Sequence, residues 1–560
     1  MKGWLFGINV DCSFLEKDSK NIENFGDGKL YTNLDNKFQN DRIMIPSGQF
    51  LEGYITNKNE LLTQYSEYNW EKCFIKLAEE KHFPGDLRGS FCGFIKKGEQ
   101  YVFFTDHIGS KAIFYYCDGE KLIVSTRLFW IVQALKFNNI HYTFNEIAAQ
   151  YMLTYGYMID DSSFIKGIKR ILPGNKIIVR DKRIYIEQYY MPSLNQIQDM
   201  SEEEAVELID KAFRIAVRRE FEKDKEYGYQ HLVDLSGGLD SRMVSWVAHD
   251  MGYSKQTNIS YCKAGYIDSA VSSKIARDLN HEYYFKQLDD FQWIYEIDEI
   301  LKLNNGEALY SGITGGKDLL SNMNTGRYGI EHTGMIGDVI ISSFALDERQ
   351  AFKKPVFGRN QSSTKLTYQF NQSILTQYEN QEIFDLYARG FLGAMSTYAI
   401  RQNYFEVSSP FLDVDFMNSC FRIPLRYRVK HKIYLKWIEQ YYKEATNYGW
   451  EKWAGVRPKK ELVIWRNFVF VTRKIKRLLR QLAGKEIKDN MNPIDYWYAN
   501  NSEAQTFFDK YFHDNINSRY ISEELRKDIT WLYNVGEADE KAQALTVLGI
   551  IKIYFEMDEC

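Results

Sequence analysis

A six-residue segment, Ser-Gly-Gly-Leu-Asp-Ser at 236–241, constrains this chain more than any other feature. A run typical of a strand, 229–235, leads into it, and residues 242–249 after it have a helical pattern. Two glycines let the backbone turn sharply and approach an anion closely. The N-terminus of the following helix would point free N–H groups at the same place. The segment therefore predicts a phosphate-binding loop between a strand and a helix.

Three side chains of this segment add to that chemistry. Ser236 and Ser241 can supply hydroxyl donors, whereas Asp240 would repel a phosphate unless a divalent cation lies between them. Mg²⁺ shared between a carboxylate and phosphate oxygens is the usual arrangement. An ordinary glycine turn ahead of a helix is the alternative for a bare Gly-Gly pair. The complete hexapeptide in its strand–turn–helix context favours the phosphate loop.

Length and composition limit the class of protein. A chain of 560 residues is too long for one compact core, so we expect two domains with a helical addition. The formal charge of −4 gives no global attraction to nucleic acid. No apolar run approaches the ~18 residues of a membrane span, and no signal-peptide pattern is present. We therefore expect a cytoplasmic protein without stable membrane insertion.

Cysteines and histidines indicate no metal centre. The seven cysteines are scattered without a Cys-x-x-Cys pair, which predicts reduced thiols and argues against a zinc site. His281 and His332 lie near the motifs described below, but no metal-ligand spacing accompanies them. We expect both to be structural.

The pattern of residues changes near residue 200. Before it, apolar runs at 100–105, 112–117, 122–126 and 176–180 are separated by turn signals, which predicts β-hairpins. After it, Ser201 and three glutamates predict the start of a helix that continues to about residue 223. Strand, glycine-rich turn and helix then alternate, which predicts a parallel α/β sheet, and beyond about residue 380 the pattern is mostly helical.

Together these motifs resemble the asparagine synthetase family, over nearly the whole chain. Segment 236–241 matches the family's pyrophosphatase loop, and 333–338 resembles its second carboxylate loop. In the N-terminal half, residues 87–94, 106–116, 164–168 and 172–174 resemble its strand and turn motifs. Residues 268–284 resemble the helix after the second strand, with Ser269 in place of the usual glutamate. Residues 410–413, 423–424 and 432–436 follow the order of its late helical signature.

The resemblance implies an α/β protein of two domains, with the boundary between 190 and 202. Residues 1–195 would form a glutamine amidotransferase type 2-like domain, an Ntn-amidotransferase-like αββα β-sandwich. Residues 196–560 would form an ATP-pyrophosphatase domain, an adenine-nucleotide α-hydrolase-like (PP-loop) parallel sheet with helical additions. A homodimer is the assembly we expect.

The resemblance also implies roles for single residues. The pyrophosphate of ATP would be held by Ser236, Gly237, Gly238, Leu239, Asp240 and Ser241. Asp240 and Asp338 would share Mg²⁺. The base and ribose would be lined by residues near Asp234, Tyr261, Thr333 and Gly334. Lys459, with Lys460 as its alternative, would face the reaction centre and neutralise developing charge. A solvated surface lysine is the other interpretation of either one.

The chain departs from the family at several positions. Glutamine-using members carry a nucleophilic cysteine where this chain has Lys2. An ammonium has no free lone pair, and Cys12 lies away from the α-amino group that serves as base, so we expect no glutaminase activity. Met335 stands where relatives have glutamate or tyrosine, and Val339 replaces a glutamate. The usual base for the attacking amine is therefore absent, and plain asparagine synthesis is less expected than another amidation.

We expect an ATP-dependent ligase that adenylates a carboxylate of a small molecule or peptide and transfers it to an amine or ammonia. A macrolactam or β-lactam cyclase is one alternative. A non-catalytic scaffold is another: it is favoured by Lys2, Ser269, Met335 and Val339 and opposed by the retained Asp240 and Asp338. A basic stretch, 466–488, could be an amphipathic helix for a partner or an ordinary solvated helix face.

Overall fold

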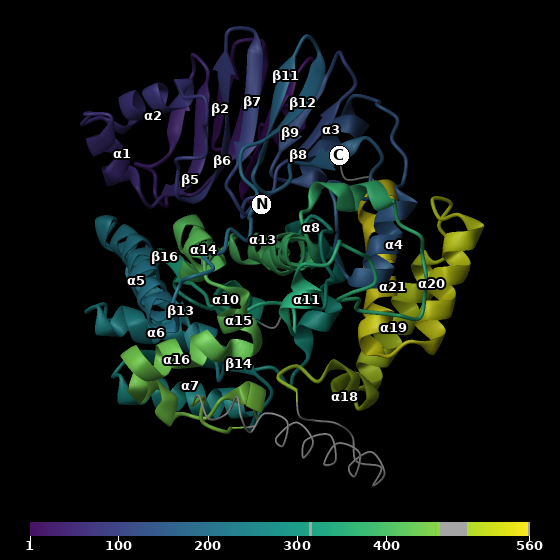
Figure 1. The fold of residues 1–560 in the computed structure, drawn as a ribbon. Coiled ribbons are helices and arrows are strands. Elements are labelled where there is room, and N and C mark those ends of the chain that lie inside the picture. The colour runs from purple at the N-terminus through teal and green to yellow at the C-terminus, as the bar shows by residue number, and fades with distance from the viewer. Residues whose placement is uncertain (313–315, 454, 460–489, 558–560) are drawn as a thin grey trace.

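The computed structural model describes residues 1–312, 316–453, 455–459 and 490–557. Two antiparallel sheets from the first part of the chain lie against a body that contains a parallel sheet and most of the helices (Figure 1). Lys460 and the basic stretch 466–488 fall outside the described residues.

Each antiparallel sheet has six strands within the described residues. The first has the order β10 (Ile168–Arg170), β8 (Phe114–Cys117), β9 (Leu122–Ser125), β1 (Gly3–Ile8), β3 (Gly28–Asn33) and β2 (Asn21–Phe25). The second has the order β12 (Arg183–Gln188), β11 (Asn175–Arg180), β7 (Gln100–Thr105), β6 (Gly89–Lys97), β5 (Gln49–Ile55) and β4 (Ile43–Ile45). The strands predicted at 100–105, 112–117, 122–126 and 176–180 are confirmed as β7, β8, β9 and β11. Strands β8 and β9 form the hairpin expected at Asp118-Gly119. The hairpin expected at Gly109-Ser110 is wrong, because the chain crosses from one sheet to the other between β7 and β8.

Alternating side chains build four layers from these sheets. On β1, Trp4 and Phe6 point between the sheets and pack on aromatic residues such as Phe94, while Leu5 points to the other face. That outer face is covered by α3 (Leu128–Phe137), with α4 (Glu146–Tyr155) in the same core. The second sheet is covered by α2 (Trp70–Glu79), which follows α1 (Lys58–Gln64). The order is helix, sheet, sheet, helix, as expected for residues 1–195.

The second body contains a five-stranded parallel sheet within the described residues. Its order is β15 (Glu282–Gln287), β14 (Gln256–Cys262), β13 (Gln230–Asp234), β16 (Tyr328–His332) and β17 (Glu406–Ser408). From β13 the chain moves outward to β14 and β15 and then returns to the opposite side of β13 as β16. The direction of winding therefore reverses between β13 and β16, and ligands of open parallel sheets bind at such a switch point, at the carboxyl ends of the strands.

Helices surround this sheet. The first, α5 (Glu202–Glu226), begins where the sequence predicts, with a capping box between Ser201 and Glu204. The others near the sheet are α6 (Asp240–Asp250), α7 (Ile267–Asp278), α10 (Gly337–Ile341), α14 (Val414–Phe421) and α16 (Lys432–Tyr441). Residues 189–201 connect β12 to α5, and the domain boundary in this segment stays a prediction.

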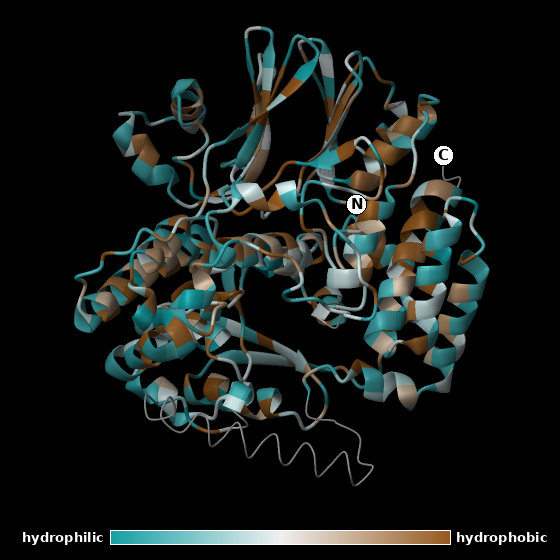
Figure 2. Cartoon of the chain, turned by 45° about the vertical axis from the view of Figure 1, so that its right-hand side comes forward, coloured by the Kyte–Doolittle hydropathy of each residue, from teal (hydrophilic) through white to brown (hydrophobic). Residues whose placement is uncertain are grey.

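The C-terminal part is helical: α18 (Ile494–Ala499), α19 (Ser502–Asn515), α20 (Glu523–Val535) and α21 (Ala538–Ile551). Helix α21 is buried on almost all sides and packs on α4. This contact joins the C-terminal helices to the first part of the chain. Hydrophobic segments (brown in Figure 2) run through the strands and inner helices, and hydrophilic segments (teal) gather at turns and on outer helices. No helix within the described residues has the length and apolar character needed to cross a bilayer. The six described cysteines form no disulfide.

Candidate active site at the switch point of the parallel sheet

The phosphate loop predicted from the sequence lies directly after β13 and leads into α6. Ser236 and Ser241 hold it closed: their hydroxyls are 2.9 Å apart, and the Ser236 N–H donates to Ser241 Oγ at 3.0 Å. The Gly238 N–H donates to Ser236 Oγ at 3.1 Å. The loop is therefore pre-shaped by its own hydroxyls, which is what an anion-binding turn at a helix N-terminus requires.

Asp240 and Asp338 meet at this loop. Asp338 lies on α10, after β16, and its backbone N–H donates to the Asp240 carboxylate. The hydroxyl of Tyr434, on α16, donates to Asp240 Oδ1 at 2.8 Å. Burial, together with the nearby charge of Asp338, raises the pKa of Asp240 to about 8. Two carboxylates forced together in this way offer the hard oxygen donors that Mg²⁺ prefers, and a cation would relieve their repulsion.

A lysine that the sequence analysis did not single out stands beside this pair. The Lys452 ammonium lies 3.2 Å from Asp338 Oδ2 and 3.1 Å from Nε2 of His431. Nδ1 of His431 is 3.0 Å from the Ser342 hydroxyl. The structure thus places a cation and an imidazole at the second carboxylate loop.

Gly334 is where the two loops touch. A Cβ on Gly334 would lie 2.6 Å from the backbone carbon of Asp240 and would also overlap the Ser241 nitrogen. Both neighbours are backbone atoms, which cannot turn away as a side chain could. Glycine is therefore required for the carboxylates of Asp240 and Asp338 to approach each other.

We expect Gly334→Ala to separate the two loops and weaken Mg·ATP binding about tenfold or more, because overpacking typically costs about 1–3 kcal/mol. Gly326→Ala is the matched control, since the nearest atom to its new Cβ is Asn324 Oδ1 at 3.4 Å. Titration calorimetry with Mg·ATP measures the effect. Equal affinities for the two variants would contradict this account of the loop contact.

A second acidic group supports the loop from the other side. The Gly237 N–H donates to Asp268 Oδ1 at 3.1 Å, and burial together with Glu451 raises the pKa of Asp268 to about 7. Glu451 in turn accepts a 2.5 Å hydrogen bond from Tyr266, and its own N–H donates to the Gly237 carbonyl at 3.1 Å. The buried Arg242 donates to the same carbonyl at 3.0 Å. Gly237 is therefore fixed through both of its peptide groups.

At the strand ends beside the loop, Arg401 organises the residues expected near the nucleotide. Its guanidinium lies 2.9 Å from Asp234 Oδ2 and 2.5 Å from Glu331 Oε1, and it also donates to the hydroxyl of Tyr261. Thr333 lies next to this group, with its hydroxyl 3.0 Å from that of Tyr398. Asp234, Tyr261, Thr333 and Gly334 thus gather at one edge of the sheet.

No family model matches the chain. The chain is 30% identical over 243 residues to a Methanocaldococcus jannaschii protein named "Putative asparagine synthetase (glutamine-hydrolyzing) 2", covering 40% of this chain and 45% of that protein. This similarity supports an asparagine synthetase-like family for the chain. It is also 26% identical over 205 residues to "Amidase chyE" of Penicillium rubens, covering 35% of this chain and 29% of that protein. The matches span less than half the length of either relative.

Solved structures with partial similarity were also found, among them the following two. One is a glutamine phosphoribosylpyrophosphate amidotransferase from B. subtilis, complexed with ADP and GMP, with a TM-score of 0.25 at 10% identity over 50% of this chain and 90% of that one. The other is described as the allosteric regulatory enzyme of purine biosynthesis, with a TM-score of 0.21 at 11% identity over 51% and 74% of the two chains. Scores at this level do not show a shared fold.

Lys2, which the resemblance places where glutamine-using relatives carry a cysteine, is part of an ionic cluster. The Lys2 ammonium lies 2.7 Å from Glu406 Oε1 and 3.3 Å from Asp35 Oδ2. Cys12 is fully buried, and burial raises the pKa of its thiol to about 12. Neither side chain offers a nucleophile at neutral pH.

Lys459 is not brought to the carboxylates by any contact among the described residues. Its side chain is exposed, and its backbone N–H donates to the Arg457 carbonyl. Its role at the reaction centre stays a prediction, and Lys460 lies outside the described residues. Lys452 and Arg401 do reach the site, yet no motif distinguishes them in the sequence from ordinary surface cations. Tyr434 lies in the late helical signature, where it had been given no role.

The histidines form hydrogen-bonded networks, and Asp224, His231 and His332 also bring three potential metal-ligand atoms within 4.8 Å of one another. His332 is held between Glu220 and Asp224, at 3.0 and 2.8 Å, and His231 approaches the same Asp224 at 3.1 Å. Although burial opposes it, hydrogen bonds and charges from Asp224 and Glu220 raise the pKa of His332 to about 9. His281 bonds to neighbouring polar side chains at both ring nitrogens.

Proposed function

We propose that this chain is an ATP-dependent carbon–nitrogen ligase that adenylates a substrate carboxylate and transfers the acyl group to an amine or ammonia. The observation that carries the proposal is the meeting of Asp240 and Asp338 at the phosphate loop. The relationship to asparagine synthetases supports an enzyme of the amide-forming kind. A scaffold without catalysis would have no physical need for two mutually repelling carboxylates beside a glycine loop.

The same reasoning extends to the two bodies of the molecule. The helix, sheet, sheet, helix layering of the first part supports an amidotransferase-type fold. The strand, glycine loop and helix at the switch point support a PP-loop nucleotide fold for the second. Their boundary near residue 195, a cytoplasmic location and a homodimer remain parts of this proposal.

The loop residues 236–241 would hold the pyrophosphate part of ATP through backbone N–H groups and the two serine hydroxyls. Mg²⁺ would be held by Asp240 and Asp338, and it would neutralise phosphate charge there. The substrate carboxylate attacks the α-phosphorus and pyrophosphate leaves. The Lys452 ammonium, which lies beside Asp338, would offset the negative charge of the departing pyrophosphate. The amine then attacks the acyl-adenylate carbonyl, and AMP leaves with the former carboxylate oxygen.

The nitrogen would come from solution rather than from glutamine. Lys2 is paired with Glu406 and Asp35, and the Cys12 thiol stays protonated. Neither can form the thioester that glutamine hydrolysis requires. Free ammonia or an amine substrate therefore supplies the nucleophile, and glutamine does not replace it.

The proposal is tested by exchange of labelled pyrophosphate into ATP in the presence of Mg²⁺ and a panel of carboxylic acids. We expect exchange that depends on one class of acid, because adenylation is reversible before the amine attacks. Direct Mg·ATP binding by calorimetry is the companion measurement. Wild-type protein that binds no Mg·ATP would remove the basis of the proposal.

A further inference from the structure

A cluster of five charged side chains, three of them buried, joins the two bodies of the molecule. Glu406, which begins β17, accepts from Lys2 at 2.7 Å through Oε1 and from Lys111 at 2.8 Å through Oε2. Lys111 also pairs with Glu52 at 3.1 Å, and Lys2 with Asp35 at 3.3 Å. The side chains of Glu406 and Lys111 are 4% and 5% exposed. One carboxylate of the parallel sheet is thus clamped by two lysines that lie next to strands of the antiparallel sheets, Lys2 before β1 and Lys111 between β7 and β8.

This clamp is charged at every physiological pH. Burial opposes ionisation of Glu406, yet the ammonium groups of Lys111 and Lys2 bring the pKa of Glu406 down to about 2. In return, the carboxylate of Glu406 raises the pKa values of both lysines above their ordinary range, against the effect of burial. Asp35 adds to this effect at Lys2 and Glu52 at Lys111. The contact is therefore permanent rather than a switch.

The strand that receives the clamp is short and lies at an edge. β17 has three residues and pairs with β16 on one side, while its other side faces β6 of the antiparallel sheets. A strand of this length has too few ladder hydrogen bonds to hold its own position. Its position must be set from outside the sheet.

β17 in turn holds the second carboxylate loop. The Ser408 carbonyl accepts from the Thr333 N–H at 2.8 Å and from the Thr333 hydroxyl at 2.9 Å. The next residue, Ser409, donates to the Met335 carbonyl at 3.3 Å. The loop that carries Asp338 is therefore built on β17.

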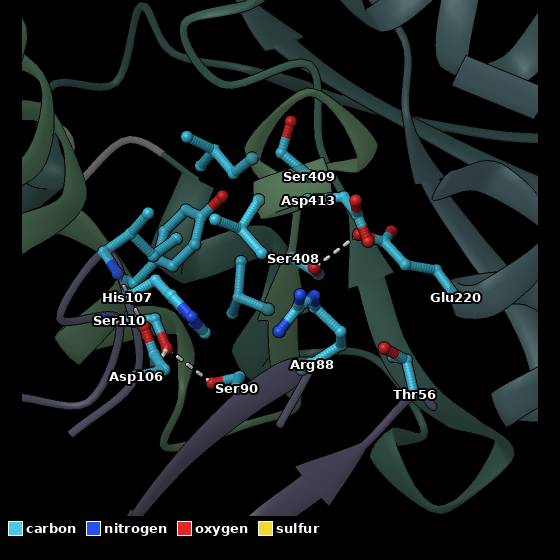
Figure 3. Close-up of a pocket in the computed structure, with 16 residues that line it drawn as sticks. Thr56, Arg88, Ser90, Asp106, His107, Ser110, Glu220, Ser408, Ser409 and Asp413 are labelled. Carbon is cyan, nitrogen blue, oxygen red and sulfur yellow. Dashed lines mark hydrogen bonds between the residues drawn. The ribbon is translucent and has the colours of Figure 1, made fainter. Parts of the chain in front are cut away.

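Figure 3 shows a pocket beside β17, where the Ser408 hydroxyl donates to the Glu220 carboxylate of α5 at 2.5 Å. The cavity beside it has a volume of about 40 Å³ and also contains Arg88 and Asp106. A smaller cavity of about 30 Å³ borders Lys2 and Lys111. Each has room for a few waters and none for a metabolite. The lysines therefore act on β17 rather than on a ligand of their own.

We propose that Lys2 and Lys111 are positioning residues for the ligase site, acting through Glu406 and β17 on the loop from Thr333 to Asp338. The effect on the ligase site rests on the proposed function, whereas the contact of the lysines with Glu406 does not. Buried ion pairs are seldom more stabilising than apolar residues of the same size, and defining one geometry is a use they can serve. The residue in the place of the lost nucleophile would thus tie the first body to the site of the second.

The first test does not need ATP. Hydrogen exchange of the apo protein should become about tenfold faster at the backbone amides of 333–338 and 406–408 in Lys2→Met and Glu406→Gln. Lys2→Arg keeps the charge and should stay near wild type. Lys29→Met is the matched control, because Lys29 pairs with Glu16 on the surface of the same sheet, where both are more than 40% exposed. Unchanged protection at both segments would overturn the proposal.

The second test separates positioning from stability. Below the lowest melting temperature of the set, Lys2→Met and Glu406→Gln should bind Mg·ATP about 5- to 20-fold more weakly, whereas Lys29→Met should not differ from wild type. Variants that melt earlier but bind normally would show a purely structural clamp and overturn the proposal. If wild type itself fails to bind, the ligase function fails, and the exchange measurement still decides whether the clamp sets the loop.

Discussion

Asp240→Asn is expected to lower ATP–pyrophosphate exchange by about 10²–10³-fold, which is the usual effect of removing one preorganised electrostatic partner of a transition state. The asparagine has nearly the same shape and still accepts from Tyr434, so the loop should persist. It cannot supply the second negative charge that Mg²⁺ would share with Asp338. Asp250→Asn is the control, because Asp250 ends the same helix in an exposed pair with Arg214.

The same substitution should make the apo protein more stable. The pKa of Asp240 is about 8 in the folded chain and about 3.9 when unfolded, so the folded state favours the protonated form. Stability is therefore lost as the pH rises from about 4 to about 8, and Asp240→Asn removes that loss. We expect a gain on the order of 1–3 kcal/mol at pH 8, which denaturant unfolding would measure. Full exchange activity or a lower stability than wild type would contradict the assignment of Asp240.

Arg401→Met should cause the largest loss of stability, about 3–5 kcal/mol, because it leaves the fully buried Glu331 and the neighbouring Asp234 without their cation. Denaturant unfolding followed by circular dichroism measures the loss. Arg277→Met, whose side chain is 74% exposed, should change it by less than about 0.5 kcal/mol.

A double variant isolates the cause. Burial and Asp234 raise the pKa of Glu331 well above its ordinary range even though Arg401 opposes this, so Glu331→Gln should remove much of the repulsion. Arg401→Met combined with Glu331→Gln should recover part of the lost stability. If the double variant is no more stable than Arg401→Met alone, the unpaired carboxylate is not the reason for the loss.

Some expectations depended only on neighbouring residues, and these were confirmed. The turn at Gly237 and Gly238, the helix start at Ser201 and the existence of the predicted strands follow from backbone freedom, capping and alternation, which act over a few residues. The pairing of those strands does not, since β7 and β8 lie in different sheets. The resemblance to asparagine synthetases could likewise be read from ordered motifs, and the relative from Methanocaldococcus jannaschii supports it. The roles assigned to the loop residues stay predictions.

Other features depend on residues far apart in the chain. Lys2 and Glu406 are separated by 404 positions, and Arg401 reaches Asp234 across 167. No local pattern could have paired them, because the same residue types occur in buried ion pairs and as exposed surface charges. Lys459 shows the converse: it matches a motif, yet the structure gives its exposed side chain no partner among the described residues.

The amino-acid sequence by itself determined that a strand, a glycine loop and a helix would follow one another at 230–250, because those preferences are local. Only the tertiary structure decided that Asp338 would come to lie against Asp240, and that Lys2 would hold the strand beneath that loop. The physical reason is the reversal of winding between β13 and β16, which brings distant carboxylates to one edge of the sheet.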